Sequence, residues 1–270
     1  MAKMSVRRKL AIASYSPPRE GNIYGKLVVD AAPGQRYLEE VRKKTGEKVS
    51  FTHLIGRAVA EALRQAPTLN GRIVLGEFEP FSTVDIAFLV ALEEGQDLAR
   101  AKVTDVDKKS VVEIARELAS KCGKLRASAD PAYEKSKDVI RMMPTWVLRP
   151  MLHLTGFLAS SLGLSLPALG VEPFPFGSCI VTSVGMFGLE EGFVPPTPFT
   201  RVPLYILVGA VKERPAVVDG QLVVQQQLTI TATIDHRFID GAQLAVLAKV
   251  VRGILENPWK LDETQTFSAS

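Results

Sequence analysis

The chain has 270 residues, of which 46 % are apolar and 23 % charged, and its formal net charge is +4. This is the composition of an ordinary globular domain, and a chain of this length can bury a large core without disulfides or metal ions. The two cysteines, Cys122 and Cys179, make neither a disulfide framework nor a metal-ligand cluster. No apolar run reaches the ~20 residues of a membrane-spanning helix. With no signal peptide at the N-terminus, we expect a cytoplasmic location and no transmembrane segment.

Basic residues gather at positions 7–9 and 42–44. Aromatic residues are not interleaved with these charges, as they are on many nucleic-acid-binding surfaces. We therefore interpret both clusters as solvated surface and expect no nucleic-acid partner. A mildly basic protein can still attract an anionic substrate.

The first half of the chain is predicted to mix helices with short strands. Ser50 is a candidate N-cap, Gly46 and Pro67 are helix stop signals, and apolar residues between Ser50 and Pro67 recur at helical spacing. The predicted elements are, in chain order, residues 25–30 (strand), 35–44 (helix), 50–66 (helix), 71–76 (strand), 84–92 (strand) and 111–124 (helix).

The second half begins with residues 126–172, which are rich in Leu, Met and Pro and predict two or three short helices forming an insertion. The pair Asp219-Gly220 between apolar runs predicts a β-hairpin turn. The remaining predicted elements are residues 178–184 (strand), 204–211 (strand), 216–218 and 222–225 (hairpin), 228–234 (strand) and 242–255 (helix). Helices and strands that do not alternate regularly favour an α+β fold over a doubly wound parallel sheet.

Three histidines are present, His53, His153 and His236. His53 and His153 have no catalytic partners nearby in sequence, so we expect structural or surface roles for both. His236 follows a predicted strand and is flanked by Asp235 and Asp240. On spacing alone, His236 belongs equally well to a catalytic site or to a salt-bridged turn.

Five segments together resemble the acyltransferase component of 2-oxoacid dehydrogenase complexes, a family that shares the fold of chloramphenicol acetyltransferase. The segment DHRFIDGA, which begins at Asp235, resembles the family's DHRxxDGA signature. The other four occur in family order and are SFTHLIGRAVAEALRQAPTLN (50–70), DVDKKSVVEIARELA (105–119), TSVGMFG (182–188) and VGAVKERPAVVDGQLVV (208–224). The resemblance implies a mixed sheet flanked by helices, and one catalytic domain over residues 1–260, interrupted at about 126–172 and followed by a flexible tail at 261–270.

The same resemblance implies a mechanism. His236 would take the proton of a thiol, either that of coenzyme A or that of a dihydrolipoyl group, and the thiolate would attack a thioester carbonyl. Thr182, or else Ser183, would donate a hydrogen bond to the oxyanion, and Asp240 would hold the loop. A thiol has a pKa near 8.5, so a neutral imidazole nearby raises the reactive thiolate fraction. On residue type alone, Thr182 and Ser183 also fit ordinary strand and turn polarity.

The resemblance also suggests partners. Lys108, Lys109 and Ser110 are candidates for contacting coenzyme A phosphates, although the same run reads as a helix N-terminus capped by Ser110. Family members form trimers, and the trimers can assemble into cages. The resemblance implies that His236 and Thr182 in one active site come from different chains of the trimer. We therefore expect a homotrimer, no metal, and a lipoyl group carried by a partner and not by this chain.

Three features depart from the family. No lipoyl domain, subunit-binding domain or Ala/Pro linker is recognisable in the sequence. After Leu92, the sequence EEGQDLARAKVTD replaces a proline-containing family pattern, and residues 126–172 form a longer segment than the family's linker. These departures keep a second hypothesis open, a catalytically inactive protein that retains the trimer or cage. A third and weaker hypothesis is acetylation of a small alcohol, as in chloramphenicol acetyltransferase.

Overall fold

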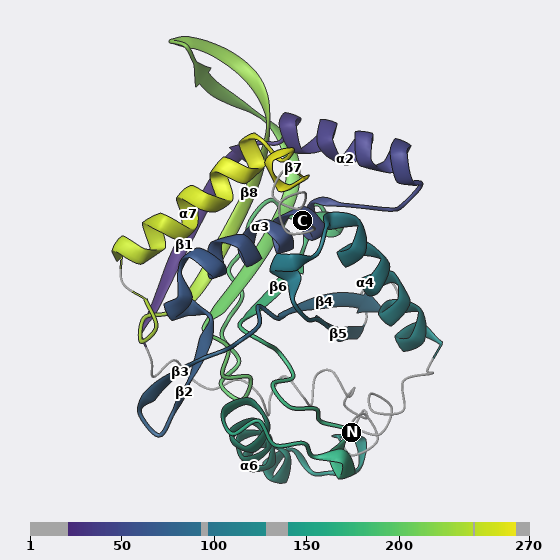
Figure 1. Cartoon of the computed structure of the whole chain (residues 1–270), viewed down its shortest axis with the longest axis vertical. Helices are drawn as coiled ribbons and strands as arrows, with labels where there is room; N and C mark the ends of the chain where they lie inside the picture. The colour runs from purple at the N-terminus through teal and green to yellow at the C-terminus, as the bar shows by residue number, and fades with distance from the viewer. Residues whose placement is uncertain (1–20, 93–96, 128–139, 240, 263–270) are drawn as a thin grey trace, which may run out of the picture.

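The computed structural model describes residues 21–92, 97–127, 140–239 and 241–262. At its centre lies a six-stranded mixed sheet in the order β1-β8-β7-β6-β4-β5 (Figure 1). The pairs β4–β6 and β6–β7 are parallel, and the other neighbours are antiparallel. A mixed sheet flanked by helices confirms the predicted α+β class.

The sheet strands are β1 (Asn22–Asp30), β4 (Ile86–Leu92), β5 (Asp97–Val103), β6 (Cys179–Ser183), β7 (Leu204–Val218) and β8 (Gln221–Asp235). A separate two-stranded ribbon contains β2 (Gly71–Val74) and β3 (Glu77–Pro80). The α-helices are α2 (Ala32–Thr45), α3 (Phe51–Gln65), α4 (Val111–Arg126), α6 (Thr145–Gly156) and α7 (Gly241–Glu256). The sequence prediction missed β3 and β5, because β3 is short and exposed and β5 carries charged residues that mask its alternation.

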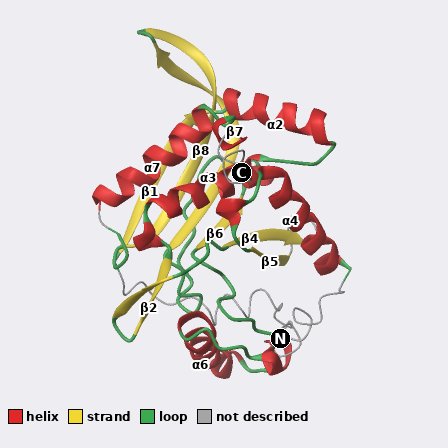
Figure 2. Ribbon diagram, in the orientation of Figure 1, coloured by secondary structure: helices red, strands yellow, loops and turns green. Residues whose placement is uncertain are grey.

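Helices α3, α4 and α7 cover one face of the sheet (Figure 2). Strand alternation sends every second side chain to this face, so Phe88, Val181 and Ile206 join one large core with α3. The intervening side chains Ala87, Ile180 and Tyr205 form a smaller cluster on the opposite face. The sheet is therefore buried on both faces at its centre, which explains why its strands read as continuous apolar runs.

The N-terminus of α3 is fixed by a local capping contact. The backbone N–H of Ser50 donates to Nδ1 of His53 at 3.0 Å, and Ser50 adopts the extended conformation of an N-cap. Burial, followed by the nearby Arg42 charge, lowers the pKa of His53 to about 4. The structural role predicted for His53 is therefore confirmed, and its imidazole is neutral at physiological pH.

Strands β7 and β8 form one long hairpin whose tip projects from the body of the protein (Figure 1). The turn residues Asp219 and Gly220 have φ values of 50° and 78°, so the predicted hairpin turn is confirmed. The separate short strands predicted here are wrong, because pairing continues from the tip into the sheet with one irregularity between Val208 and Val211. Near the tip, Val217, Leu222 and Val224 are 73 %, 77 % and 76 % exposed.

Much of the predicted insertion is helical in the part that the structure describes. Helix α6 runs directly into a π-helical segment, Phe157–Ser161, and a 3₁₀ turn follows at Pro167–Leu169. Residues 128–139, which belong to the same prediction, lie outside the described residues. The large side chains of Met142 and Trp146 are exposed.

The predicted flexible tail begins too early. Leu261 is buried, and Asp262 accepts a hydrogen bond from the Tyr37 hydroxyl at 3.0 Å. The prediction of a tail from residue 261 is therefore wrong for these two residues, because Leu261 is buried in the core and the Tyr37 hydroxyl of α2 holds Asp262. Residues 263–270 lie outside the described residues.

Candidate active site

His236 lies in an exposed turn directly after β8. Its backbone N–H donates to the carbonyl of Gly21 at 3.1 Å, which ties the turn to the start of β1. The flanking residues form an ion pair, with Arg237 Nη2 2.5 Å from Asp235 Oδ2. Buried Phe238 then anchors the turn in the core. The imidazole is therefore presented on a well-braced turn, as a general base requires.

Asp240, the other predicted site residue of this motif, lies outside the described residues. Its loop-holding role stays a prediction. The structure does show that Asp235 forms the ion pair with Arg237. A salt-bridged turn was the alternative to catalysis at this position, and an exposed imidazole between two ion-paired residues is compatible with both.

Thr182 and Ser183 end β6, two strands away from β8 in the sheet. Strand alternation places Thr182 on the same face as Ile180, and Ser183 on the helix-covered face with Val181. The Ser183 Oγ lies 3.4 Å from both the Val208 carbonyl, to which it donates, and the Gly185 N–H, from which it accepts. Thr182 and Ser183 thus offer their hydroxyls to opposite sides of the sheet.

The register of the sheet separates these hydroxyls from His236 within one chain. Ile234 pairs with Leu204, whereas Thr182 pairs with Leu207. His236 is two residues beyond Ile234 in the opposite direction, so about five residues, or roughly 16 Å along the strands, separate it from Thr182. Two strand spacings add roughly 10 Å across the sheet. A single chain therefore does not bring the predicted base and the predicted oxyanion donor together.

An open cavity of about 460 Å³ adjoins Ser183. Its lining includes the cationic residues Arg42 and Lys212 and the hydroxyl-bearing residues Ser50 and Thr52. The Arg42 guanidinium donates to the Val49 carbonyl, at 2.7 Å from Nη2, which fixes its position beside the cavity. Arg42 was predicted to lie on a solvated surface, because the proximity of residues 42–52 to residues 183–188 is a tertiary feature without a local signal.

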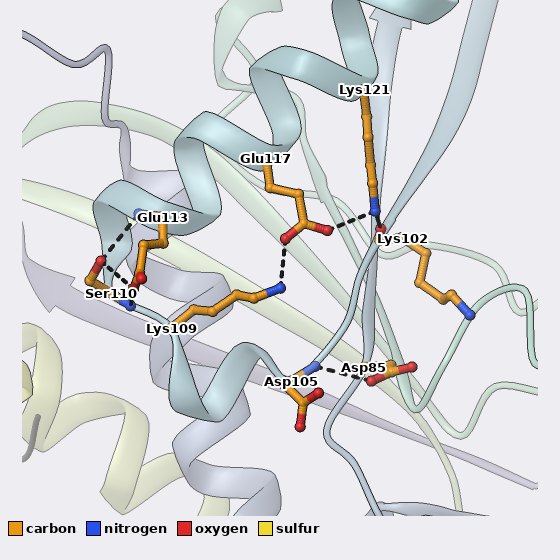
Figure 3. Close-up of polar contacts among 8 residues, drawn as sticks. All are labelled: Asp85, Lys102, Asp105, Lys109, Ser110, Glu113, Glu117 and Lys121. Atoms are coloured by element: carbon orange, nitrogen blue, oxygen red, sulfur yellow. Dashed lines mark hydrogen bonds and ion pairs between the residues drawn. The ribbon is translucent and has the colours of Figure 1, made fainter. Parts of the chain in front are cut away.

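The predicted cofactor-binding residues Lys108, Lys109 and Ser110 each make local contacts, and Figure 3 shows those of Lys109 and Ser110. The Ser110 Oγ accepts from the Glu113 N–H at 3.1 Å, while the Glu113 carboxylate accepts from the Ser110 N–H at 2.7 Å. This is a capping box at the start of α4, so the capping alternative for Ser110 is confirmed.

Both lysines of this run are ion-paired. Lys108 Nζ lies 2.6 Å from Asp105 Oδ1, and Lys109 Nζ lies 2.6 Å from Glu117 Oε2. Glu117 is also paired with Lys121, as Figure 3 shows. These contacts account for the residue pattern without a ligand, and a role in binding cofactor phosphates stays a prediction.

His153, expected to be structural or at the surface, lies on α6 and lines a polar cavity together with Asp235 and Arg237. The sequence carried no signal for this shared cavity, because residues 153 and 235 are distant along the chain. Among the residues that the structure describes, no group of three or more His, Cys, Asp or Glu side chains is arranged to hold a metal ion. In the same part of the chain, no helix is both long and apolar enough for a membrane span.

The sheet order, the helices on one face and the histidine turn after β8 define a protein with the fold of chloramphenicol acetyltransferase. The solved chloramphenicol acetyltransferase structure aligns with a TM-score of 0.51 at 14 % identity and covers 94 % of this chain and 96 % of its own. The family model for the 2-oxoacid dehydrogenases acyltransferase (catalytic domain) matches residues 28–133 and 168–262. The chain belongs to this family.

Individual relatives agree with this assignment. The probable dihydrolipoyllysine-residue succinyltransferase component of the mitochondrial 2-oxoglutarate dehydrogenase complex of Schizosaccharomyces pombe is 25 % identical over 84 % of this chain and 42 % of its own length. The probable dihydrolipoamide acetyltransferase of Listeria monocytogenes aligns with a TM-score of 0.65 at 21 % identity, covering 88 % of this chain and 85 % of that one. The cubic core of a pyruvate dehydrogenase multienzyme complex gives a TM-score of 0.64 at 18 % identity, covering 95 % and 87 %.

The chain spans about two fifths of the length of the first curated relatives that it matches, 42 % and 39 % for the two yeast proteins. The family model leaves residues 134–167 unmatched, and these residues fall within the predicted insertion. They include all of α6 and the π-helical segment. The predicted cytoplasmic location stays a prediction, and the two yeast relatives are described as mitochondrial.

Proposed function

We propose that this protein transfers an acyl group between the thioester of coenzyme A and a thiol of the dihydrolipoyl type. The observation that carries the proposal is His236, exposed on a braced turn within the segment that resembles the family signature. His236 removes the thiol proton, and the thiolate attacks the thioester carbonyl to form a tetrahedral oxyanion. The oxyanion then collapses, the carbon–sulfur bond of the original thioester breaks, and the departing thiolate takes a proton from the imidazolium.

The oxyanion donor is a hydroxyl from a second copy of the chain, Thr182 in the first instance and Ser183 otherwise. The wide separation of both hydroxyls from His236 within one chain supports a site shared between subunits. One hydrogen-bond donor to an oxyanion lowers the activation free energy by about 2.7–4 kcal/mol. The open cavity beside Ser183, with Arg42 and Lys212 in its lining, is a suitable place for the phosphates of coenzyme A.

Self-association into a homotrimer follows from the same proposal. The exposed apolar side chains Val217, Leu222 and Val224 lie on the projecting hairpin, where Leu222 and Val217 are cross-strand partners. An exposed apolar row on a projecting element marks an interaction surface. The structural relative that forms a cubic core supports further assembly into a cage, with a lipoyl-bearing protein as the partner that delivers the second thiol.

The test is an assay of acyl-CoA consumption with dihydrolipoamide as acceptor. His236→Ala should lower kcat by about 10²- to 10⁴-fold, the usual contribution of a general base. His53→Gln is the matched control, because His53 serves in a helix cap. Equal inactivity of the unmodified protein and His236→Ala over a broad acyl panel would refute catalysis and favour the inactive scaffold.

A mixing experiment tests the shared site. Thr182→Ala and His236→Ala chains, each nearly inactive alone, should recover roughly a quarter of the unmodified activity when co-assembled at random, because each intact site takes one residue from each chain. Ser183→Ala replaces Thr182→Ala in a second arm. No recovery in either arm, with mixed oligomers confirmed by differential tags, would contradict a site shared between subunits.

A further inference from the structure

The insertion is fixed to the body of the protein through one face of α6. The buried residues of this inner face, Leu148, Leu152 and Gly156, recur every four residues and so lie along one side of the helix. Gly156 approaches Phe199 so closely that an added Cβ would lie 2.1 Å from the Phe199 carbonyl oxygen. Phe199 in turn packs edge-on against Phe176, at 5.9 Å between ring centres. The opposite side of α6 is therefore presented to the surroundings in a fixed orientation.

The outer face of α6 is apolar as well. Trp146, Pro150 and Leu154 follow one another at the same four-residue spacing, and all three are exposed. The exposed fraction is 79 % for Trp146 and 58 % for Leu154, and it is 84 % for Met142, which lies shortly before the helix. A surface helix normally carries polar and charged residues on its outer face. The outer face of α6 therefore has the character of an interaction surface.

The charge of the insertion decides between the kinds of partner. The residues that the family model leaves unmatched, 134–167, contain four cationic side chains and two carboxylates, namely Lys135, Lys137, Arg141 and Arg149 against Glu134 and Asp138. Their formal net charge of +2 is the same whichever ion pairs form within the segment. No Asp or Glu occurs from residue 139 to residue 171. The outer face of α6 thus lies in a basic stretch of sequence, which complements an anionic surface.

A lipid surface fits this face better than a second copy of the chain does. In a two-fold contact between copies, the same residues of both copies meet, so the basic stretch would face itself without a carboxylate of its own to neutralise it. Tryptophan beside arginine, as in Trp146 and Arg149, is typical of helices at the membrane interface, where the indole ring spans the boundary between headgroups and acyl chains. Figure 1 shows α6 at the opposite end of the molecule from the projecting hairpin, so a contact on α6 leaves the hairpin accessible.

We propose that the outer face of α6, together with Met142, docks this protein on the surface of a membrane that contains anionic phospholipid. Trp146, Leu154 and Met142 enter the boundary between headgroups and acyl chains, and the basic residues of the insertion supply the preference for anionic lipid. The helix lies in the plane of this boundary, because its 12 residues are too few to cross a hydrocarbon core of ~30 Å. The inference is independent of the proposed acyl transfer and adds a place of action to it.

The test uses the whole chain with two kinds of vesicle, phosphatidylcholine alone and phosphatidylcholine mixed with phosphatidylglycerol. The protein should co-float with the mixed vesicles and bind the neutral ones more weakly. Trp146→Ser should weaken binding to mixed vesicles by about tenfold to hundredfold, the loss expected for one large buried side chain. Arg149→Gln should weaken it by about fivefold, and only when phosphatidylglycerol is present. Leu75→Asn is the matched control, because Leu75 is 86 % exposed in the turn between β2 and β3, far from the insertion in sequence, and its φ of 51° suits asparagine.

Fluorescence reports the contact directly. The chain has two tryptophans, and the other one, Trp259, donates from Nε1 to Glu40 at 2.9 Å. Trp259→Phe therefore leaves Trp146 as the single tryptophan, whose emission should move to shorter wavelength on mixed vesicles and be quenched by brominated lipid chains. Unshifted emission, equal binding by Trp146→Ser and Leu75→Asn, or equal binding to neutral and mixed vesicles would overturn the proposal. A changed oligomeric mass of Trp146→Ser without vesicles would also overturn it, since a second copy would then cover this face.

Discussion

Protonation of His53 should destabilise the protein below pH 6.5. The Nδ1 atom of His53 accepts the Ser50 N–H at 3.0 Å, so it must be unprotonated for the cap of α3 to form. Burial and the Arg42 charge lower the pKa of His53 from 6.5 to about 4 in the folded protein. Between pH 6.5 and about pH 4, the imidazole of His53 is therefore protonated more readily in the unfolded chain than in the folded protein.

The sign and size of the effect follow from linkage. Because the folded-state pKa is the lower one, the contribution of His53 to the free energy of unfolding is complete above pH 6.5 and is lost as pH falls toward 4. The interval between the two pKa values corresponds to about 3 kcal/mol at most, since one pKa unit is about 1.4 kcal/mol. A loss of this size is a large fraction of a typical domain stability of about 5–15 kcal/mol.

The assay is urea unfolding followed by circular dichroism at intervals from pH 8 to pH 4. His53→Gln is the comparison, because a glutamine at the third helical position can accept the N-cap N–H without titrating. The free energy of unfolding of the unmodified protein should fall by about 3 kcal/mol more than that of His53→Gln over this range. Parallel pH curves for the two proteins would refute the assignment of this proton to His53.

Two further predictions concern assembly and the insertion. Leu222→Lys combined with Val224→Lys should weaken self-association by about 2–4 kcal/mol per copy, since each side chain is about three quarters exposed on the hairpin and full burial yields about 1.5–3 kcal/mol. Sedimentation velocity measures this loss, and Gln221→Lys, at an exposed position, is the control. Identical sedimentation profiles for the unmodified protein and the double variant would exclude the hairpin from the interface. Gly156→Ala should lower the free energy of unfolding by about 1–3 kcal/mol through overpacking against Phe199, as measured by urea unfolding. Full stability in Gly156→Ala would contradict the close approach of α6.

The amino-acid sequence by itself determined the local elements and the family. Helical periodicity after Ser50, the Asp219-Gly220 turn and the capping residue Ser110 each express short-range chemistry, and the structure contains all three. The run from Asp235 to Ala242 indicated a histidine site through its resemblance to a family signature, whereas its spacing alone fitted a salt-bridged turn equally well.

Only the tertiary structure decided which distant residues meet. The sheet register separates His236 from Thr182 in one chain, and no local pattern encodes that register. The folded chain likewise places His153 and Arg201 at a cavity beside the His236 turn, although the three residues are distant from one another along the chain. Such contacts depend on packing between elements, such as Gly156 against Phe199, whose energies arise from shape and burial after the local elements have formed.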